Sequence, residues 1–242
     1  MDNATKQELM TYLSQYVTQH KLHRIDAVLK NRTRHIAIVL EDLYQTHNAS
    51  AVIRSCECFG IQDLYAIENK NVFRTHKAIA SGSGKWVDVH RFTGSGEENS
   101  AACIATLKQK NYQIVVTTLN GEAVPPDAID LSRPVALFFG NEELGVSPNI
   151  VEAAESFVKI PMFGFTQSFN ISVSAALLLS NLITRLHQSQ ITWRLSEQEM
   201  FDLRLDWIQR VEGNNSKKMA LLKQHFFQNR QSNSGNGQAV EP

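Results

Sequence analysis

The sequence has few cysteines and no long apolar run. Its three cysteines, Cys56, Cys58 and Cys103, are odd in number and follow neither a CxxC pattern nor a paired metal-ligand pattern. We therefore expect reduced core thiols rather than disulfides or a zinc site. No apolar stretch approaches the ~20 residues that span a bilayer, and residues 1–10 lack the basic and apolar regions of a signal peptide. These absences predict a cytoplasmic protein that does not enter a membrane.

The sequence also lacks net charge, because 24 Lys and Arg residues balance 24 Asp and Glu residues. A contact with nucleic acid must therefore come from local basic patches rather than from the overall charge. The chain has 242 residues, of which 43% are hydrophobic and 20% charged. This length and composition fit a globular protein with one large α/β domain and extensions, or with two small domains.

Several catalytic motifs are missing as well. The eight histidines form no HExxH motif, and we expect no metal site. No GxSxG is present, which gives hydrolase chemistry little support. The segment SGSGKW (81–86) lacks both the glycine spacing of a phosphate loop and the complete GxGxxG of a dinucleotide-binding domain. We interpret it as a flexible loop whose backbone N–H groups and Lys85 could contact a polyanion.

Short β-branched runs alternate with helical patterns between residues 35 and 190, which predicts an α/β fold. The continuous apolar character of the runs indicates a mostly parallel sheet with helices on both faces. Ligands of such sheets bind at the carboxyl ends of the strands. The expected strands are His35–Leu40, Gln62–Ile67, Trp86–Arg91, Gln113–Thr118, Val135–Phe139 and Ser156–Ile160, and the expected helices are Ala49–Phe59, Glu97–Lys110, Ser147–Glu155 and Asn170–His187.

The two ends of the chain differ from this central region. Residues 1–34 show helical spacing and a basic bias, and we interpret them as a basic helical extension. Residues 35–190 form the expected core and residues 191–228 a second helical extension, in which Ser196 and Glu199 form a capping-box pattern. The tail 229–242 has too few apolar residues to order itself.

Three segments of the core carry candidate chemistry. HNASAVIRSCECFG places Asn48 six residues before Arg54, LFFGNEELGVS ends a strand at Gly140 before Glu142, and IPMFGFTQSFN brings Ser168 and Asn170 to the start of an apolar helix. Each has an ordinary alternative, namely an ion-pairing arginine, a turn with solvated acids, and a helix cap. A cap explains only one residue of the third segment. A bound adenosine would also supply partners for the backbone groups of that loop.

Taken together and in this order, the segments resemble the SpoU–TrmH family of SPOUT RNA methyltransferases. The family pattern is N-x-x-x-x-x-R, then G-x-E-x-x-G, then I-P-M-x-G-x-x-x-S-L-N-x-S-x-A, and the likeness spans about residues 35–187. ASGSGKW is close to a Gly/Ser loop that the family has between the first two segments. The departures are small: Phe169 replaces the usual leucine, and Phe163 and Phe165 make the third segment more aromatic.

The resemblance implies a fold, a cofactor and a reaction. It implies a trefoil knot, a homodimer with a shared active site, and S-adenosylmethionine as methyl donor to a ribose 2′-hydroxyl of RNA. The layout of the extensions resembles the tRNA-acting branch, which modifies a D-loop guanosine. Methylation of ribosomal RNA and a non-catalytic RNA-binding homologue remain alternatives.

The resemblance also implies site residues. A guanidinium is always protonated and accepts no hydrogen bond, so we prefer a role for Arg54 as a clamp on a phosphate and on the developing oxyanion. A general-base role, with Glu142 positioning the arginine, stays open as the alternative. The implied catalytic residues are Asn48, Arg54, Glu142, Ser168 and Asn170. The implied cofactor-binding residues are Thr117, Thr118, Leu119, Gly140, Ile160, Met162, Ser168, Phe169 and Asn170. From the basic flanks and the Gly/Ser loop we expect RNA contacts at Lys21, Arg24, Arg32, Arg34, Lys85, Lys217 and Lys218.

Overall fold

A computed structural model describes residues 1–76, 82–94, 98–119, 121–211 and 216–235. The chain divides into two compact units. The larger unit comprises Arg32–Arg194, and the smaller one joins Met1–Asn31 to Leu195–Pro242. The two are described separately. Along the helices that are described, none is long and apolar enough to cross a membrane.

The larger unit contains a six-stranded sheet with the strand order β3-β2-β1-β5-β4-β6. Every pair of neighbouring strands in it is parallel, which confirms the predicted fold class. Each strand begins and ends within two residues of its predicted bounds. The strands are β1 (Ile36–Glu41), β2 (Asp63–Ile67), β3 (Asp88–Phe92), β4 (Gln113–Thr117), β5 (Val135–Phe139) and β6 (Ser156–Val158).

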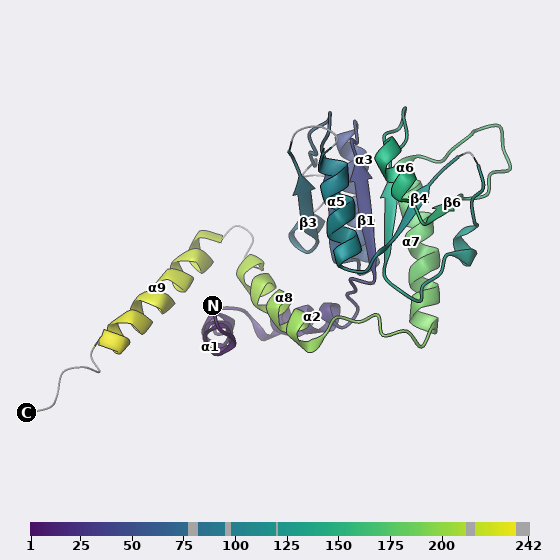
Figure 1. The fold of residues 1–242 in the computed structure, drawn as a ribbon. Coiled ribbons are helices and arrows are strands. Elements are labelled where there is room, and N and C mark those ends of the chain that lie inside the picture. Colours follow the sequence, from purple (N-terminus) through teal and green to yellow (C-terminus); the bar gives the residue numbers. More distant parts are fainter. Residues whose placement is uncertain (77–81, 95–97, 120, 212–215, 236–242) are drawn as a thin grey trace, which may run out of the picture. The chain divides into compact units, whose positions relative to one another are not determined.

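Helices cover both faces of this sheet (Figure 1). Side chains alternate between the faces of a strand, so Ile36, Ile38 and Leu40 of β1 join one apolar cluster and Ala37 and Val39 join the other. The first cluster packs beneath α3 (Thr46–Cys58) and α7 (Ile171–Gln188), and the second beneath α5 (Glu98–Gln109) and α6 (Pro148–Ala153). The described part of this unit also contains the short helices η1 (Ser83–Lys85) and η2 (Pro126–Ala128).

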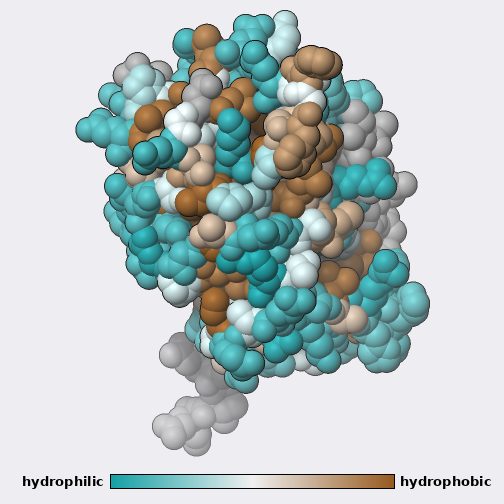
Figure 2. Space-filling view, turned by 90° about the vertical axis from the view of Figure 1, so that its right-hand side faces the viewer, coloured by the Kyte–Doolittle hydropathy of each residue, from teal (hydrophilic) through white to brown (hydrophobic). Residues whose placement is uncertain are grey.

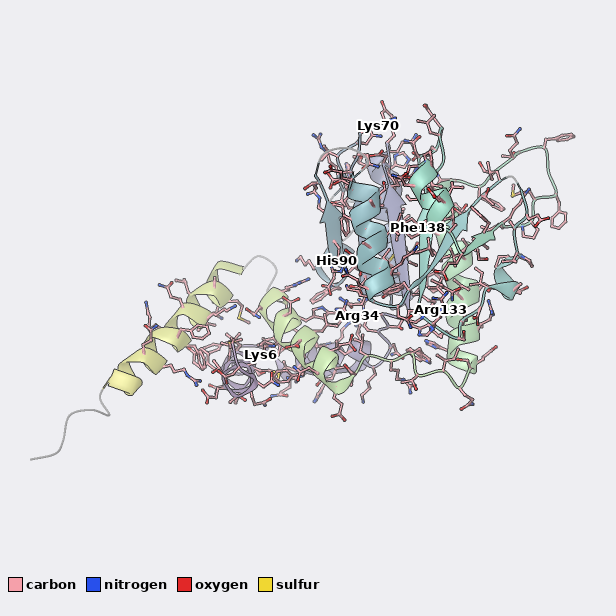
Figure 3. The ribbon with its side chains drawn as sticks, viewed as in Figure 1. Lys6, Arg34, Lys70, His90, Arg133 and Phe138 are labelled. Atoms are coloured by element: carbon pink, nitrogen blue, oxygen red, sulfur yellow. The ribbon has the colours of Figure 1, made fainter. Side chains whose placement is uncertain are left out.

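A charged cluster stabilises the amino-terminal edge of the sheet. Arg34 contacts both Asp63 and Asp88, and His90 Nε2 lies 2.8 Å from Asp63 Oδ1. Burial by itself raises the pKa of the Asp63 carboxyl, but the hydrogen bond from His90 and the charge of Arg34 outweigh burial and hold that pKa below its ordinary value. The cluster lies at the end of the sheet opposite Lys70 (Figure 3).

The smaller unit contains only helices in its described part. These are α1 (Asn3–Ser14), α2 (Gln19–Leu29), α8 (Glu197–Arg210) and α9 (Ser216–Gly235). The sequence predicts two separate extensions, whereas here α8 packs against α1, α2 and α9. Arg204 Nε donates to Asp26 Oδ1 over 2.6 Å and links α8 to α2. The capping box of Ser196 and Glu199 is present as predicted.

Candidate active site

A cavity of about 640 Å³ opens at the carboxyl ends of β4, β5 and β6. Its walls come from the loops that follow these strands and from the first turns of α3 and α7. The strand order changes direction nearby, because β1 lies between β2 and β5 rather than at an edge. Carboxyl ends next to such a reversal are where parallel sheets bind their ligands.

All nine residues that the sequence predicts for cofactor binding line this one cavity. They are Thr117, Thr118, Leu119, Gly140, Ile160, Met162, Ser168, Phe169 and Asn170. Two side chains fix the backbone around them. Thr117 Oγ1 donates to the Phe138 carbonyl over 2.9 Å, and Lys159 Nζ donates to the Leu119 carbonyl over 2.7 Å.

The turn after β5 forms a rigid wall of the cavity. Asn141 and Gly145 exchange two backbone hydrogen bonds of 2.8 and 2.9 Å, and Asn141 Oδ1 accepts a further bond from the Glu143 N–H at 2.8 Å. Gly145 has a φ of +71°, which favours glycine. A Cβ atom on Gly140 would lie 2.1 Å from the Gly145 carbonyl carbon. Both glycines are therefore required by the shape of the turn.

Three polar side chains from different parts of the chain form a continuous hydrogen-bonded row. Asn48 Nδ2 donates to Glu142 Oε1 over 2.7 Å, and Asn48 Oδ1 accepts from Asn170 Nδ2 over 3.0 Å. Asn170 Oδ1 in turn accepts from the backbone N–H of Ser172 at 2.8 Å. We call Glu142, Asn48 and Asn170 the polar row. It joins the turn after β5, helix α3 and the start of α7.

The row contains one predicted helix cap, and helix α3 begins earlier than the predicted Ala49. Asn170 is the N-cap of α7, as its position before the apolar helix suggested. Asn48 is not a cap, because α3 begins at Thr46 with Gln45 as its N-cap. Asn48 instead lies in the first turn with its side chain buried, where its amide bridges the other two members.

Two neighbours of the polar row, Gln45 and Tyr44, were not predicted from the sequence. Asn48 Nδ2 also donates to Gln45 Oε1 over 3.2 Å, and the Tyr44 N–H lies 3.5 Å from Glu142 Oε2. Gln45 and Lys159 both line the cavity. No sequence signal marked Gln45, because the predicted helix begins at Ala49, after both Gln45 and Asn48.

Arg54 lies apart from these groups. It is exposed on α3, six residues after Asn48, and it is not among the residues that line the cavity. Its side chain makes no hydrogen bond or ion pair within the described part of the chain. Of the five predicted catalytic residues, the structure therefore brings Asn48, Glu142, Ser168 and Asn170 to the cavity and leaves Arg54 outside it, on the same helix as Asn48.

The predicted RNA contacts differ in their accessibility. The prediction for Arg32 is wrong, because its side chain is 0% exposed and its guanidinium donates to the Ile61 carbonyl over 3.0 Å. The Arg34 guanidinium forms ion pairs with the carboxylates of Asp63 and Asp88. Lys85, Arg24 and Lys218 are exposed, whereas Lys21 is half-buried. The side chain of Lys217 lies outside the described residues, as does Ser81 of the Gly/Ser loop.

The structure also locates the cysteines and bears on metal binding. Cys56 and Cys103 are buried, and burial raises the pKa of the Cys56 thiol to about 12. Cys58 is exposed, which differs from the expectation that all three thiols lie in the core.

The residues with described positions contain no group of three His, Cys, Asp or Glu side chains that could hold a metal ion.

Comparison with known proteins identifies the family. The model of the SpoU rRNA methylase family matches residues 35–180. The chain belongs to this family. The match covers more than half of the chain and contains the whole cavity and the polar row, so the resemblance seen in the sequence is confirmed.

The relatives of this SpoU-family chain include named enzymes. It is 39% identical over 202 residues to the tRNA (guanosine(18)-2′-O)-methyltransferase of Borreliella burgdorferi, a match that covers 84% of this chain and 90% of the relative. The Aquifex aeolicus TrmH/SpoU tRNA modifying enzyme superposes with a TM-score of 0.69 at 31% identity, over 78% of this chain and 95% of that one.

A more distant structure shares the fold alone. The SpoU methyltransferase AviRb from Streptomyces viridochromogenes, solved in complex with the cofactor AdoMet, superposes with a TM-score of 0.56 at 19% identity. That match covers 66% of this chain and 64% of AviRb.

Proposed function

We propose that this SpoU-family protein transfers a methyl group from S-adenosylmethionine to the ribose 2′-hydroxyl of a guanosine in the D-loop of tRNA. The observation that carries the proposal is the cavity beside the polar row. Residues from the Glu142 segment and the Ser168–Asn170 segment line this cavity, and so does Asn48 from the remaining segment. The Borreliella relative, which matches along most of both chains, is named for guanosine 18 of tRNA. We place the reaction in the cytoplasm.

The cavity suits the adenosyl part of this cofactor. Its volume of about 640 Å³ lies within the range of roughly 300–1,000 Å³ that is usual for small-molecule sites. Leu119, Met162 and Leu178 offer apolar walls for a flat ring, and the polar atoms of Thr118 and Ser168 lie among them. When bound, the cofactor would supply a methyl group that its sulfonium already activates for displacement.

The protein then has to align the ribose hydroxyl and stabilise the charge that develops on it. Alignment is worth several kcal/mol in a reaction of this kind. We assign this alignment to the polar row. Its hydrogen bonds connect Asn48 of α3 to the Glu142 carboxylate and to Asn170 at the start of α7, and so hold these groups in place. Arg54 lies outside the cavity of its own chain, so in the shared site of a homodimer it would act at the partner subunit's cavity, where its fixed fork of N–H donors would hold the adjacent phosphate and the developing oxyanion. The hydroxyl proton would leave to phosphate or water.

A methylation assay with two classes of RNA tests this function. The purified full chain is incubated with S-adenosylmethionine and with transcripts of tRNA or of ribosomal RNA fragments, and the 2′-O-methyl positions are mapped. We expect one modified guanosine in the D-loop of tRNA and none in the ribosomal transcripts. Modification of ribosomal RNA alone would favour the first alternative. RNA binding without any cofactor binding would indicate a non-catalytic homologue.

We also propose that the protein is a homodimer with a knotted core, as the family resemblance implies. An apolar face of the larger unit supports the dimer. Val173 and Leu177, one turn apart on α7, are 43% and 44% exposed, and Phe169, just before the helix, is 41% exposed. Figure 2 faces the side on which α7 and β6 lie in Figure 1 and shows hydrophobic side chains at the surface among polar ones.

Replacing Leu177 with lysine should separate the subunits. A charge placed in an apolar interface loses its hydration without gaining a partner, and this cost disfavours association. Sedimentation velocity should show mainly monomer at micromolar concentration, with methylation reduced in parallel. Gln109→Lys, at an exposed polar position on α5 on the opposite face of the sheet, is the control and should leave the mass unchanged. A Leu177→Lys variant with the same mass as the wild type would contradict an interface at this face.

A further inference from the structure

The segment that follows β2 has a strong local excess of positive charge. No Asp or Glu occurs between Asn69 and Val87, although the whole chain has equal numbers of acidic and basic residues. Lys70, Arg74 and Lys85 are all exposed in this stretch. The described residues Asn69–His76 form its first part, which we call the basic segment.

The basic segment is held firmly at its start. Asp42 follows β1 with a φ of +51°, and its Oδ1 accepts hydrogen bonds from the backbone N–H groups of Asn69, Lys70 and Asn71 at 2.8, 2.8 and 3.1 Å. Phe73 then packs against the core cluster beneath α3 and α7. With the backbone fixed in this way, the Lys70 and Arg74 side chains project from a defined position.

The far end of the basic segment reaches the helix that carries Arg54. The His76 N–H donates to Ser50 Oγ over 2.6 Å. Ser50 precedes Arg54 by four residues on α3, so the two side chains occupy the same face of that helix one turn apart. The helix η1, which ends at Lys85, also packs against α3. The basic segment therefore leads from the carboxyl end of β2 to the neighbourhood of Arg54.

Nearby acidic groups do not neutralise the segment. The Asp42 carboxylate is committed to three backbone N–H groups, and Glu68 is paired with Arg91 through bonds of 2.6 and 2.9 Å. The side chains of Lys70 and Arg74 make no ion pair or hydrogen bond with any residue whose position is described. Figure 3 shows Lys70 at the end of the sheet opposite Arg34 and Arg133. Both cations are thus available to an external anion.

We propose that Lys70 and Arg74 bind the phosphate backbone of the RNA substrate and lead the strand to Arg54. The inference rests on the function proposed above and adds a substrate-binding surface to it. Two exposed cations on an anchored backbone suit consecutive phosphates, which position a nucleic acid without reading its sequence. Arg54 would then hold the phosphate beside the target ribose, at the end of the same track.

The salt dependence of RNA binding tests the proposal. The affinity of a tRNA transcript is measured by fluorescence anisotropy at several salt concentrations, for the wild type, Lys70→Ala, Arg74→Ala and the double variant. Each lost phosphate contact lowers the slope of log affinity against log salt by about 1, so the double variant should lose about 2. The KM for tRNA should rise about tenfold in that variant, with a smaller change in kcat. Arg74→Lys should retain the slope.

Lys108→Ala is the matched control. Lys108 is an exposed lysine on α5, in the same unit, and is not part of the basic segment. Its removal should leave both the slope and KM unchanged. Thermal melting of each variant establishes that it is folded.

The outcomes separate the two proposals. If the wild type methylates tRNA and the double variant keeps the full slope and KM, the assignment of the basic segment is overturned and the proposed function stands. A fall in kcat with unchanged KM would also overturn it. If the wild type methylates neither class of RNA, the proposed function fails. The slope of log RNA affinity against log salt, compared between the wild type and the double variant, then decides by itself whether the basic segment contacts phosphate.

Discussion

Replacing Arg54 with alanine should reduce methyl transfer by about 10³-fold or more, the size of effect seen when a charge-stabilising group is lost from an active site. S-adenosylmethionine should bind to the variant as it does to the wild type. The reason is structural: Arg54 is exposed on α3 and does not line the cavity, so its removal leaves the cavity walls intact. Turnover of a tRNA transcript measures the first expectation, and equilibrium dialysis of the cofactor measures the second.

Arg54→Lys distinguishes charge from geometry. Lysine keeps the positive charge but lacks the planar fork that grips a phosphate through two parallel hydrogen bonds. We expect this variant to recover part of the activity and to have a raised KM for RNA. If Arg54→Ala lost cofactor binding, the role of Arg54 as a clamp on the RNA would be refuted. Retention of full activity would refute any catalytic role.

Replacing Gly140 with alanine should damage the cavity itself. The added methyl group would meet three backbone atoms of Gly145 and Val146 at 2.1–2.3 Å, and backbone atoms cannot rotate away as a side chain does. The turn must therefore shift, at a cost of about 1–3 kcal/mol in the free energy of unfolding. Because this turn carries Glu142 and lines the cavity, we also expect the affinity for S-adenosylmethionine to fall about tenfold or more.

Gly84→Ala is the matched control for this substitution. Gly84 lies in η1 and does not line the cavity, and a Cβ atom there would meet no other atom within 4 Å. We expect wild-type melting temperature and cofactor affinity for Gly84→Ala, measured by thermal denaturation and equilibrium dialysis. Wild-type values for Gly140→Ala would show that the turn adapts easily, contrary to the shape described above.

The elements that the sequence predicted well are those that local pattern determines. The continuous apolar runs mark the buried parallel strands, since such strands face helices on both sides. The side chain of Asn170 caps α7, and Ser196 with Glu199 caps α8, because a cap depends on residues only two or three positions away. The gathering of three segments at the carboxyl edge followed from the general rule for parallel sheets.

The features that the sequence could not predict depend on contacts between distant residues. Asn48 pairs with Glu142 and Asn170, which are 94 and 122 positions away, and helical spacing carries no information about such partners. In the sequence, Arg32 looks like one more exposed cation of the basic extension 1–34, but tertiary packing buries it against the carbonyl of Ile61. The association of α1 and α2 with α8 is equally non-local.

The double role of Asn170 restricts which residues can replace it. Its carbonyl oxygen closes the first turn of α7, and its amide nitrogen holds Asn48. Aspartate or serine would serve the helix end equally well, yet neither offers an N–H to Asn48, and aspartate would bring a second negative charge towards Glu142. A substitution at this position therefore changes the helix terminus and the reactive centre together, because the oxygen of one carboxamide serves the helix and its nitrogen serves the site.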